Sequence, residues 1–471
     1  MGIKLDWQVE SEQSQVKATE DPDARRRRQI ARHQMLAVIG ALACVLAGIG
    51  GLIAWRLWSV DSRLRQDLLD TVEVEITALR VGDLANFMAV QRSASDSFLL
   101  EQSRHFEEYQ QLKQARRIEL TGEVLSTEID EPRGRVVVQE IIDGVPYQVV
   151  WFYWHYEDAG SNDQPGWRHV PDDLTFWGEE REIKALPVTI HYQALDEKLA
   201  QALAPRLQDW WTRGCQLITC RQTLPPLKVE IVADRQKLLG WAADDAWTLR
   251  ISSPLVGRSR ADLPLAPELE SDIAHQIADR LVAYAAGDLG LLPYTDAAWL
   301  QSEIGRWLAD SFLGVNNNFV QSLVAGYGPG VPNTLLAAVQ GGALLDGALL
   351  AVTGVPAAML SPDQLNTLVW RDFFQWRLQQ EWSLLAQGDS AAFLSLYDQE
   401  SVSALNEATL RLGDATYTAA AVPQVGAVTI NRDDQGQTYA YASATQSQGG
   451  VSVSELTIIW RLAGSTWKRG N

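Results

Sequence analysis

His275 and Asp279 lie four residues apart in a stretch of helical periodicity, so both side chains project from one face of a helix predicted at about 266–287. An imidazole and a carboxylate on one helix face are zinc ligands, and Glu303 on the next predicted helix, about 296–313, is a possible third. Gln276 stands beside His275, where a general base would act. A glutamine cannot take a proton from zinc-bound water, so these residues predict at most a metal site without its base.

The strands and the helix predicted before His275 indicate the kind of domain that contains these residues. Strands are predicted at Leu186–Tyr192, Pro226–Val232 and Ala246–Ser252, and an amphipathic helix at Leu195–Arg213. A strand-rich segment comes first, the helix with His275 follows, and the next helix carries Trp299-Leu300-x-x-Glu303-x-Gly305. This order resembles the gluzincin metallopeptidases of the peptidase MA type. Those read H-E-x-x-H on one helix and W-L-x-E-G on the next. The resemblance implies a mixed α/β domain of peptidase ancestry.

The chain departs from that family at the residues that do the chemistry. Asp279 replaces the second histidine, and Glu303 falls one residue late, which turns it by about 100° around its helix. We therefore expect no catalytic residue, with His275, Gln276, Asp279 and Glu303 as vestiges, and neither zinc nor another cofactor. The alternative is a metallopeptidase with an unusual metal site made of His275, Asp279 and Glu303.

A motif occurs twice at an offset of 306 residues. Leu79 to Met88 and Leu385 to Leu394 share the pattern L-x-x-G-D-x-A-x-F-[ML], and each follows a long amphipathic stretch. Glycine suits the end of one helix and aspartate the start of the next, so Gly82-Asp83 and its repeat predict a helical elbow. Each copy continues with alternating strand patterns and closes near a tryptophan, Trp167 or Trp467.

This order resembles the nuclear transport factor 2-like (SnoaL-like) fold, in which a helix lies in the concavity of a bent sheet. Enzymes of that family place His, Asp or Tyr inside the cone, and His105 is the candidate in the first copy, although its helix is predicted to be mostly solvated. The second copy contains no histidine. We expect both copies to be non-catalytic modules, the alternative being small-molecule binding or an enzymatic site in a cone cavity.

Met35–Trp55 is an uncharged run of 21 residues, which as a helix spans about 32 Å and therefore a bilayer core. Five arginines precede it, and Trp55 and Trp58 follow as interfacial residues do. The positive-inside rule predicts a cytoplasmic N-terminus and an extracytoplasmic C-terminal region. A cleaved signal peptide has a shorter apolar core, and a lipoprotein cleavage before Cys44 would leave most of the run in place.

Composition supports a folded, extracytoplasmic protein. The chain has 471 residues and a net charge of −19, of which residues 1–33 carry about +1, so the acidity belongs to the remainder and disfavours nucleic acid as a partner. Cys215 and Cys220 are the cysteines beyond the apolar run, and a disulfide between them is expected in an oxidising compartment.

Together these patterns predict an α+β, multidomain, single-pass membrane protein of a bacterial cell envelope. Its predicted segments are a tail at 1–33, a transmembrane helix at 34–58, nuclear transport factor 2-like domains at 59–183 and 359–471, and a peptidase MA-like domain at 184–358. The expected function is binding or scaffolding without catalysis. The expected partners are the lipid bilayer, through Met35–Trp55, and an envelope protein or small ligand of unknown identity.

Overall fold

The computed structural model describes residues 22–157, 165–220, 223–236, 239–287, 289–292, 294–315, 317–414, 421–448 and 451–470. The fold is mixed α+β, with about 53% helix and 24% strand, as predicted. Contacts divide the chain into two units. The first holds the chain up to Gln114, Ser126–Val136 and Phe152–Pro171, and the second holds Ala115–Leu125, Val137–Trp151 and the chain from Asp172 onward. The three-domain division stays a prediction, and residues 1–21 of the predicted tail lie outside the described residues.

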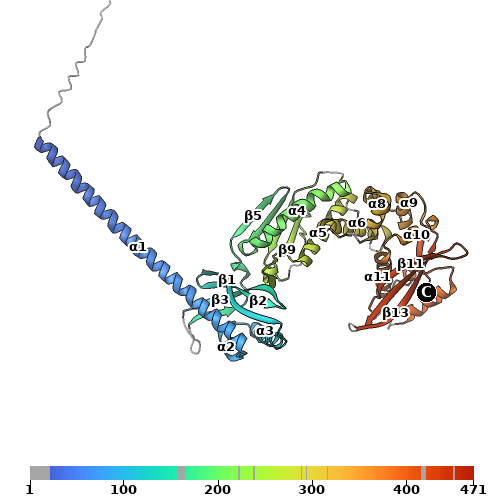
Figure 1. Ribbon diagram of the computed structural model, residues 1–471, viewed down its shortest axis with the longest axis horizontal. Helices are drawn as coiled ribbons and strands as arrows, with labels where there is room; N and C mark the ends of the chain where they lie inside the picture. The colour runs from blue at the N-terminus through green and yellow to red at the C-terminus, as the bar shows by residue number, and fades with distance from the viewer. Residues whose placement is uncertain are drawn as a thin grey trace, which may run out of the picture. The chain divides into compact units, whose positions relative to one another are not determined.

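The apolar run lies in a single long helix, α1 (Pro22–Val81), drawn in blue in Figure 1. In the part of the chain that the structure describes, α1 is the one helix long and apolar enough to cross a membrane. Its apolar side chains from Met35 to Trp55, and that of Trp58, are exposed, whereas farther along Leu68, Val72 and Ile76 are at most 2% exposed. The four-residue spacing of these three puts them on one face, which therefore packs into the first unit.

The predicted elbow after α1 is confirmed. Gly82 has a φ of +86°, a left-handed conformation that favours glycine, and Asp83 then caps α2 (Leu84–Val90) by accepting a hydrogen bond from Asn86 N at 3.1 Å. Phe87 of α2 is fully buried. Helix α3 (Asp96–Gln114) follows, close to the predicted helix around His105.

The strands after α3 form an antiparallel sheet. Its members are β1 (Ile118–Asp130), β2 (Arg133–Ile142), β3 (Val145–Tyr156) and β10 (Arg258–Arg260), in that order, with β4 (Gly166–Val170) beside β3. The register of β3 and β4 places Tyr153 opposite His169 and His155 opposite Trp167. Trp167 is 1% exposed and donates from Nε1 to the Leu64 carbonyl at 3.1 Å, which ties the closing strand to α1.

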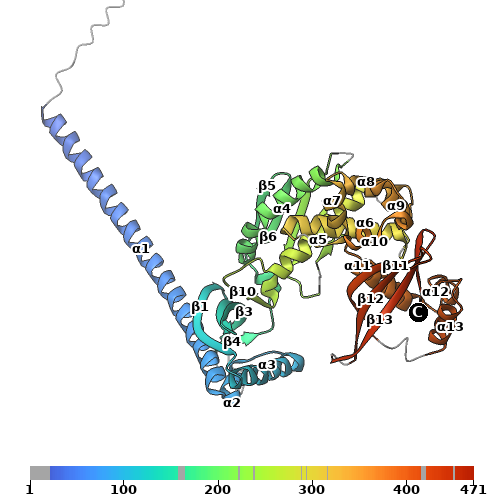
Figure 2. The same cartoon turned by 45° about the vertical axis from the view of Figure 1, so that its right-hand side comes forward.

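The middle of the chain forms a second, mixed sheet with helices against it (Figure 2). Its strand order is β5 (Glu180–Ala185), β6 (Val188–Gln193), β7 (Leu227–Val232), β9 (Thr248–Ser252) and β8 (Gly240–Trp241). Pairs β6–β7 and β7–β9 are parallel, and the outer pairs are antiparallel. The helices are α4 (Glu197–Ile218), α5 (Pro267–Ala286) and α6 (Asp296–Leu313). Every predicted strand and helix of this region is present within a few residues.

Short helices connect this region to the C-terminal one. They are α7 (Phe319–Tyr327), α8 (Val331–Gln340), α9 (Leu345–Thr353) and α10 (Pro362–Asn366). Short 3-10 helices lie at Leu174–Phe176, Ala194–Asp196, Pro254–Val256 and Ala357–Met359. The apolar stretch near residue 350 forms α9, and Leu345 and Leu349 are at most 4% exposed. Helix α9 is therefore part of the core.

The C-terminal region repeats the architecture of the first. Its elements are α11 (Arg371–Gln387), α12 (Ser390–Ser395), α13 (Val402–Gly413), β11 (Gln424–Arg432), β12 (Thr438–Gln448), β13 (Val451–Ala463) and β14 (Thr466–Arg469). The strands are antiparallel in chain order, and the ring of Phe374 on α11 stacks on Trp460 of β13 at 4.3 Å. Gly388 (φ +73°) and Asp389, which accepts from Ala392 N at 3.0 Å, form the same elbow as Gly82 and Asp83. The predicted repeat of the elbow is therefore confirmed.

Candidate functional site

The two predicted metal ligands on α5, His275 and Asp279, contact neighbouring parts of the protein. His275 is half-buried, and its Nδ1 lies 2.8 Å from the Ser271 carbonyl one turn earlier, so Nδ1 carries a proton and donates. Asp279 is turned toward α6: a Cβ added to Gly305 would lie only 2.2 Å from Asp279 Oδ1. Glycine at 305 thus allows the close approach of α6 to the Asp279 carboxylate.

Glu303 forms its ion pair with a residue of its own helix. It is 1% exposed and lies 3.1 Å from Arg306 Nη1, and a second nitrogen contact of 2.7 Å joins the same Arg306 Nη1 to Asp372 on α11. The late position of Glu303 in the motif accounts for this, because one residue turns a side chain by about 100° around a helix. Among the described residues, no group of three or more His, Cys, Asp or Glu side chains lies close enough to hold a metal ion.

A cavity of about 280 Å³ lies beside Glu303, between α6 and α11. Its lining residues are Tyr294, Ala298, Trp299, Ser302, Glu303, Arg306, Asp372, Gln375, Trp376 and Gln379. Residues three and four apart on each helix share a face, which explains why 299, 302, 303 and 306 meet 372, 375, 376 and 379. The cavity combines indole walls with two carboxylates and one guanidinium.

Burial raises the pKa of Glu303 to about 7. The positive charge of Arg306 opposes this rise, whereas the negative charges of Asp372 and Asp310 add to it. Neither carboxylate oxygen of Glu303 has a hydrogen-bond partner among the described residues. Glu303 therefore gains or loses its proton near neutral pH, inside a cavity.

A second polar cluster lies in the core of the first unit. Glu75 of α1 is 1% exposed, and its Oε1 contacts His169 Nδ1 at 2.7 Å and accepts from Gln91 Nε2 at 2.8 Å. Its Oε2 accepts from the Tyr153 hydroxyl at 2.8 Å. Burial alone would raise the pKa of Glu75, but the charge of His169 and the three hydrogen bonds hold it below its ordinary value. Burial, then the negative charge of Glu75, raises the pKa of Tyr153.

The C-terminal region holds the equivalent cluster at the repeat offset. Glu381 lies 306 residues after Glu75 and Tyr397 lies 306 after Gln91, while Arg469 pairs with Tyr397 by the same isolated parallel bridge that joins His169 to Gln91. Arg469 Nη1 donates to the two oxygens of Glu381 at 3.1 and 2.9 Å, and the Tyr397 hydroxyl lies 3.3 Å from Oε2. The buried carboxylate thus occurs in both copies, with a histidine partner in one and an arginine in the other.

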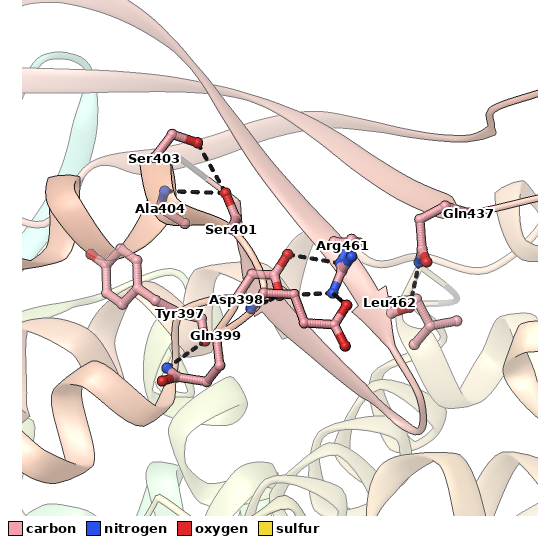
Figure 3. A network of polar contacts seen from close by, with 10 residues as sticks. Tyr397, Asp398, Gln399, Ser401, Ser403, Ala404, Gln437, Arg461 and Leu462 are labelled. Carbon is pink, nitrogen blue, oxygen red and sulfur yellow. Dashed lines mark hydrogen bonds and ion pairs between the residues drawn. The ribbon is translucent and has the colours of Figure 1, made fainter. Parts of the chain in front are cut away.

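The chain next to Tyr397 is fixed by a further ion pair. Asp398 and Arg461 of β13 lie together, with guanidinium Nη2 and Nε each 2.8 Å from a carboxylate oxygen (Figure 3). Backbone hydrogen bonds from Asp398 N to Arg469 O and from Arg469 N to Leu396 O, both 2.9 Å, hold β14 against the segment that follows α12. In this region, then, the carboxylate cluster joins α11 and the segment after α12 to the last strand of the sheet.

In the first copy, the histidine beside the buried carboxylate Glu75 is His169, which the sequence did not single out. His105 lies on α3 and is half-buried, whereas the cluster with the buried carboxylate contains His169, next to the closing Trp167. Glu75, Gln91 and Tyr153 were not predicted as site residues. The repeat offered a signal, since extending the 306-residue offset back along α1 aligns Glu75 with Glu381.

Cys215 and Cys220 form a disulfide in the structure, with their Cα atoms 5.0 Å apart. The bridge closes the end of α4, where Thr219 adopts a φ of +49° as the helix terminates. Cys44 is a free, exposed cysteine of α1.

Comparison of the chain with protein-family models, curated proteins and solved structures found no match. The two family resemblances therefore remain predictions from the motifs and the order of the elements.

Proposed function

We propose that the chain is a single-pass membrane protein with an extracytoplasmic binding or scaffolding region whose peptidase MA-like domain lacks zinc chemistry. The nuclear transport factor 2-like modules then flank that domain as non-catalytic parts. The apolar part of α1, with its arginines before and tryptophans after, supports the anchor.

The observation that carries this proposal is the separation of the would-be zinc ligands. His275 and Asp279 lie on α5, while the Glu303 carboxylate is turned to Arg306 and the α11 residue Asp372. A zinc peptidase needs its ligands to converge on one point and needs a base beside the metal-bound water. Gln276 supplies no base, so these residues do not fit metal-assisted hydrolysis. The zinc content of the purified chain tests this part.

The orientation predicts the outcome of proteolysis of intact cells. Protease added outside should cleave the region after Ser59 and leave an N-terminal fragment containing the apolar run and the tail, because the arginines before Met35 favour a cytoplasmic N-terminus. Fragments are followed with a tag on each end, and cells permeabilised beforehand serve as the control for cleavability. A C-terminal region that is protected in intact cells and cleaved after permeabilisation would refute the topology.

A second candidate function is a site in the first cone-shaped module. It is favoured by the His169–Glu75 contact of 2.7 Å and by Tyr153, since His, carboxylate and Tyr can act in acid–base chemistry. The equivalent Glu381–Arg469 pair argues for a structural role, because a cluster present in both copies with a non-titrating arginine in one is better explained by packing. We therefore do not assign the proposed binding function to this cluster.

A further inference from the structure

The cavity between α6 and α11 has a buried carboxylate whose hydrogen-bonding capacity is unused. Glu303 is 1% exposed, yet both of its oxygens lack hydrogen bonds among the described residues. The 3.1 Å contact with Arg306 Nη1 is an ion pair without hydrogen-bond alignment. A carboxylate accepts several hydrogen bonds, and leaving a buried one without them is costly. Such a group is expected where a ligand supplies the missing donors.

The charges facing Glu303 favour a positively charged ligand. From α6 these are Arg306 and Asp310, and from α11 Asp372. The single guanidinium is already engaged at 2.7 Å with Asp372, which also receives Arg371 Nε at 3.1 Å. Two of the three charged groups that act on Glu303 are thus acidic, and an added cation lowers the repulsion among the carboxylates.

The walls of the cavity suit the carbon part of such a ligand. The indole rings of Trp299 and Trp376 lie 6.0 Å apart between centroids, and Tyr294 lies at the exposed edge, where its hydroxyl accepts from Ser383 Oγ at 2.6 Å. Aromatic faces attract organic cations by their quadrupole as well as by apolar contact. A volume of about 280 Å³ is at the small end of ligand pockets.

We propose that this cavity binds a small organic cation, an amidinium, guanidinium or amine, whose N–H groups donate to Glu303 and whose carbon skeleton packs on Trp299 and Trp376. The inference rests on the proposed function: if the extracytoplasmic region binds a ligand without catalysis, this cavity sets the chemical class of that ligand.

Benzamidine is the probe, and benzamide, which has nearly the same shape and no charge, is its control. Calorimetric titration of the full chain in detergent should show benzamidine binding that is at least about tenfold tighter than benzamide binding, the difference expected when a charged hydrogen-bonded pair is lost. Glu303→Gln keeps the shape and should weaken benzamidine by about tenfold or more. Glu101→Gln, an exposed carboxylate on α3, should bind like the wild type.

A pH series adds a readout that does not depend on that variant. The cation binds the ionised carboxylate, so affinity should fall about tenfold per unit as the pH drops below the pKa of Glu303, about 7, and should level off above it. Ala298→Leu fills the cavity without changing its charges and should abolish binding.

Equal affinity for benzamidine and benzamide, or benzamidine binding that survives both Glu303→Gln and Ala298→Leu, would overturn the inference. Failure of benzamidine to bind any form would also overturn it, without affecting the proposed absence of zinc chemistry. Stoichiometric zinc in the purified chain would instead overturn the proposed function.

Discussion

Glu381→Leu should lower the free energy of unfolding of the C-terminal region by about 3–5 kcal/mol, the usual cost of breaking a buried ion pair by removing one partner. Glu381 is 1% and Arg469 4% exposed, and Arg469 Nη1 donates to both carboxylate oxygens. The substitution removes this ion pair from a guanidinium that cannot lose its charge. Urea or thermal unfolding of the full chain, followed by tryptophan fluorescence, measures the change.

The double variant Glu381→Leu with Arg469→Met is the matched control. Replacing both members of a buried ion pair by apolar groups of similar size is often nearly neutral, so the double variant should recover most of the lost stability. A cost below about 1 kcal/mol for Glu381→Leu would mean that the pair is not desolvated as the structure shows.

Glu303→Gln should remove a loss of unfolding free energy of about 3 kcal/mol that the wild type undergoes as the pH rises. The pKa of Glu303 is raised by burial from 4.5 to about 7 in the folded chain, so the folded state holds this proton more tightly than the unfolded state does. At pH values below 4.5 both states are protonated and the group has no effect. Between 4.5 and 7 wild-type stability falls as the pH rises, and above 7 the full penalty remains.

The measurement for Glu303 is unfolding of wild type and variant at pH 4 to 8. The stability of Glu303→Gln relative to wild type should increase across that range, because only the wild type loses stability as Glu303 ionises. The buried amide of the Glu303→Gln variant also lacks hydrogen-bond partners, which lowers its stability by the same amount at every pH. The change of the stability difference with pH therefore reports on Glu303, whereas its value at a single pH does not. A flat difference for Glu303→Gln would show that Glu303 ionises at its ordinary pKa.

Local signals in the sequence were enough for most of the fold. The elbows at Gly82-Asp83 and Gly388-Asp389 were predicted because a left-handed turn and an N-cap favour those two residue types. The parallel strands β6, β7 and β9 are alternating β-branched segments, which periodicity detects. The two-residue β8 and three-residue β10 have too few residues to show a period, and neither was predicted.

The site was less predictable because it depends on distant contacts. Nothing in the sequence immediately around Glu75 distinguishes it from the exposed Glu73 two residues earlier. Glu75 is buried because it lies on the packed face of α1. Likewise Asp372 lies 69 residues after Glu303, so their shared Arg306 contact follows from the packing of α11 on α6.

The zinc content of the full chain, purified from cells without chelator, tests the central claim most directly. Because the His275, Asp279 and Glu303 side chains do not converge, we expect far less than one zinc per chain and no change in metal content on His275→Ala. About one zinc per chain, lost on His275→Ala but retained in a control such as His105→Ala, would contradict the account and establish a metal site on α5.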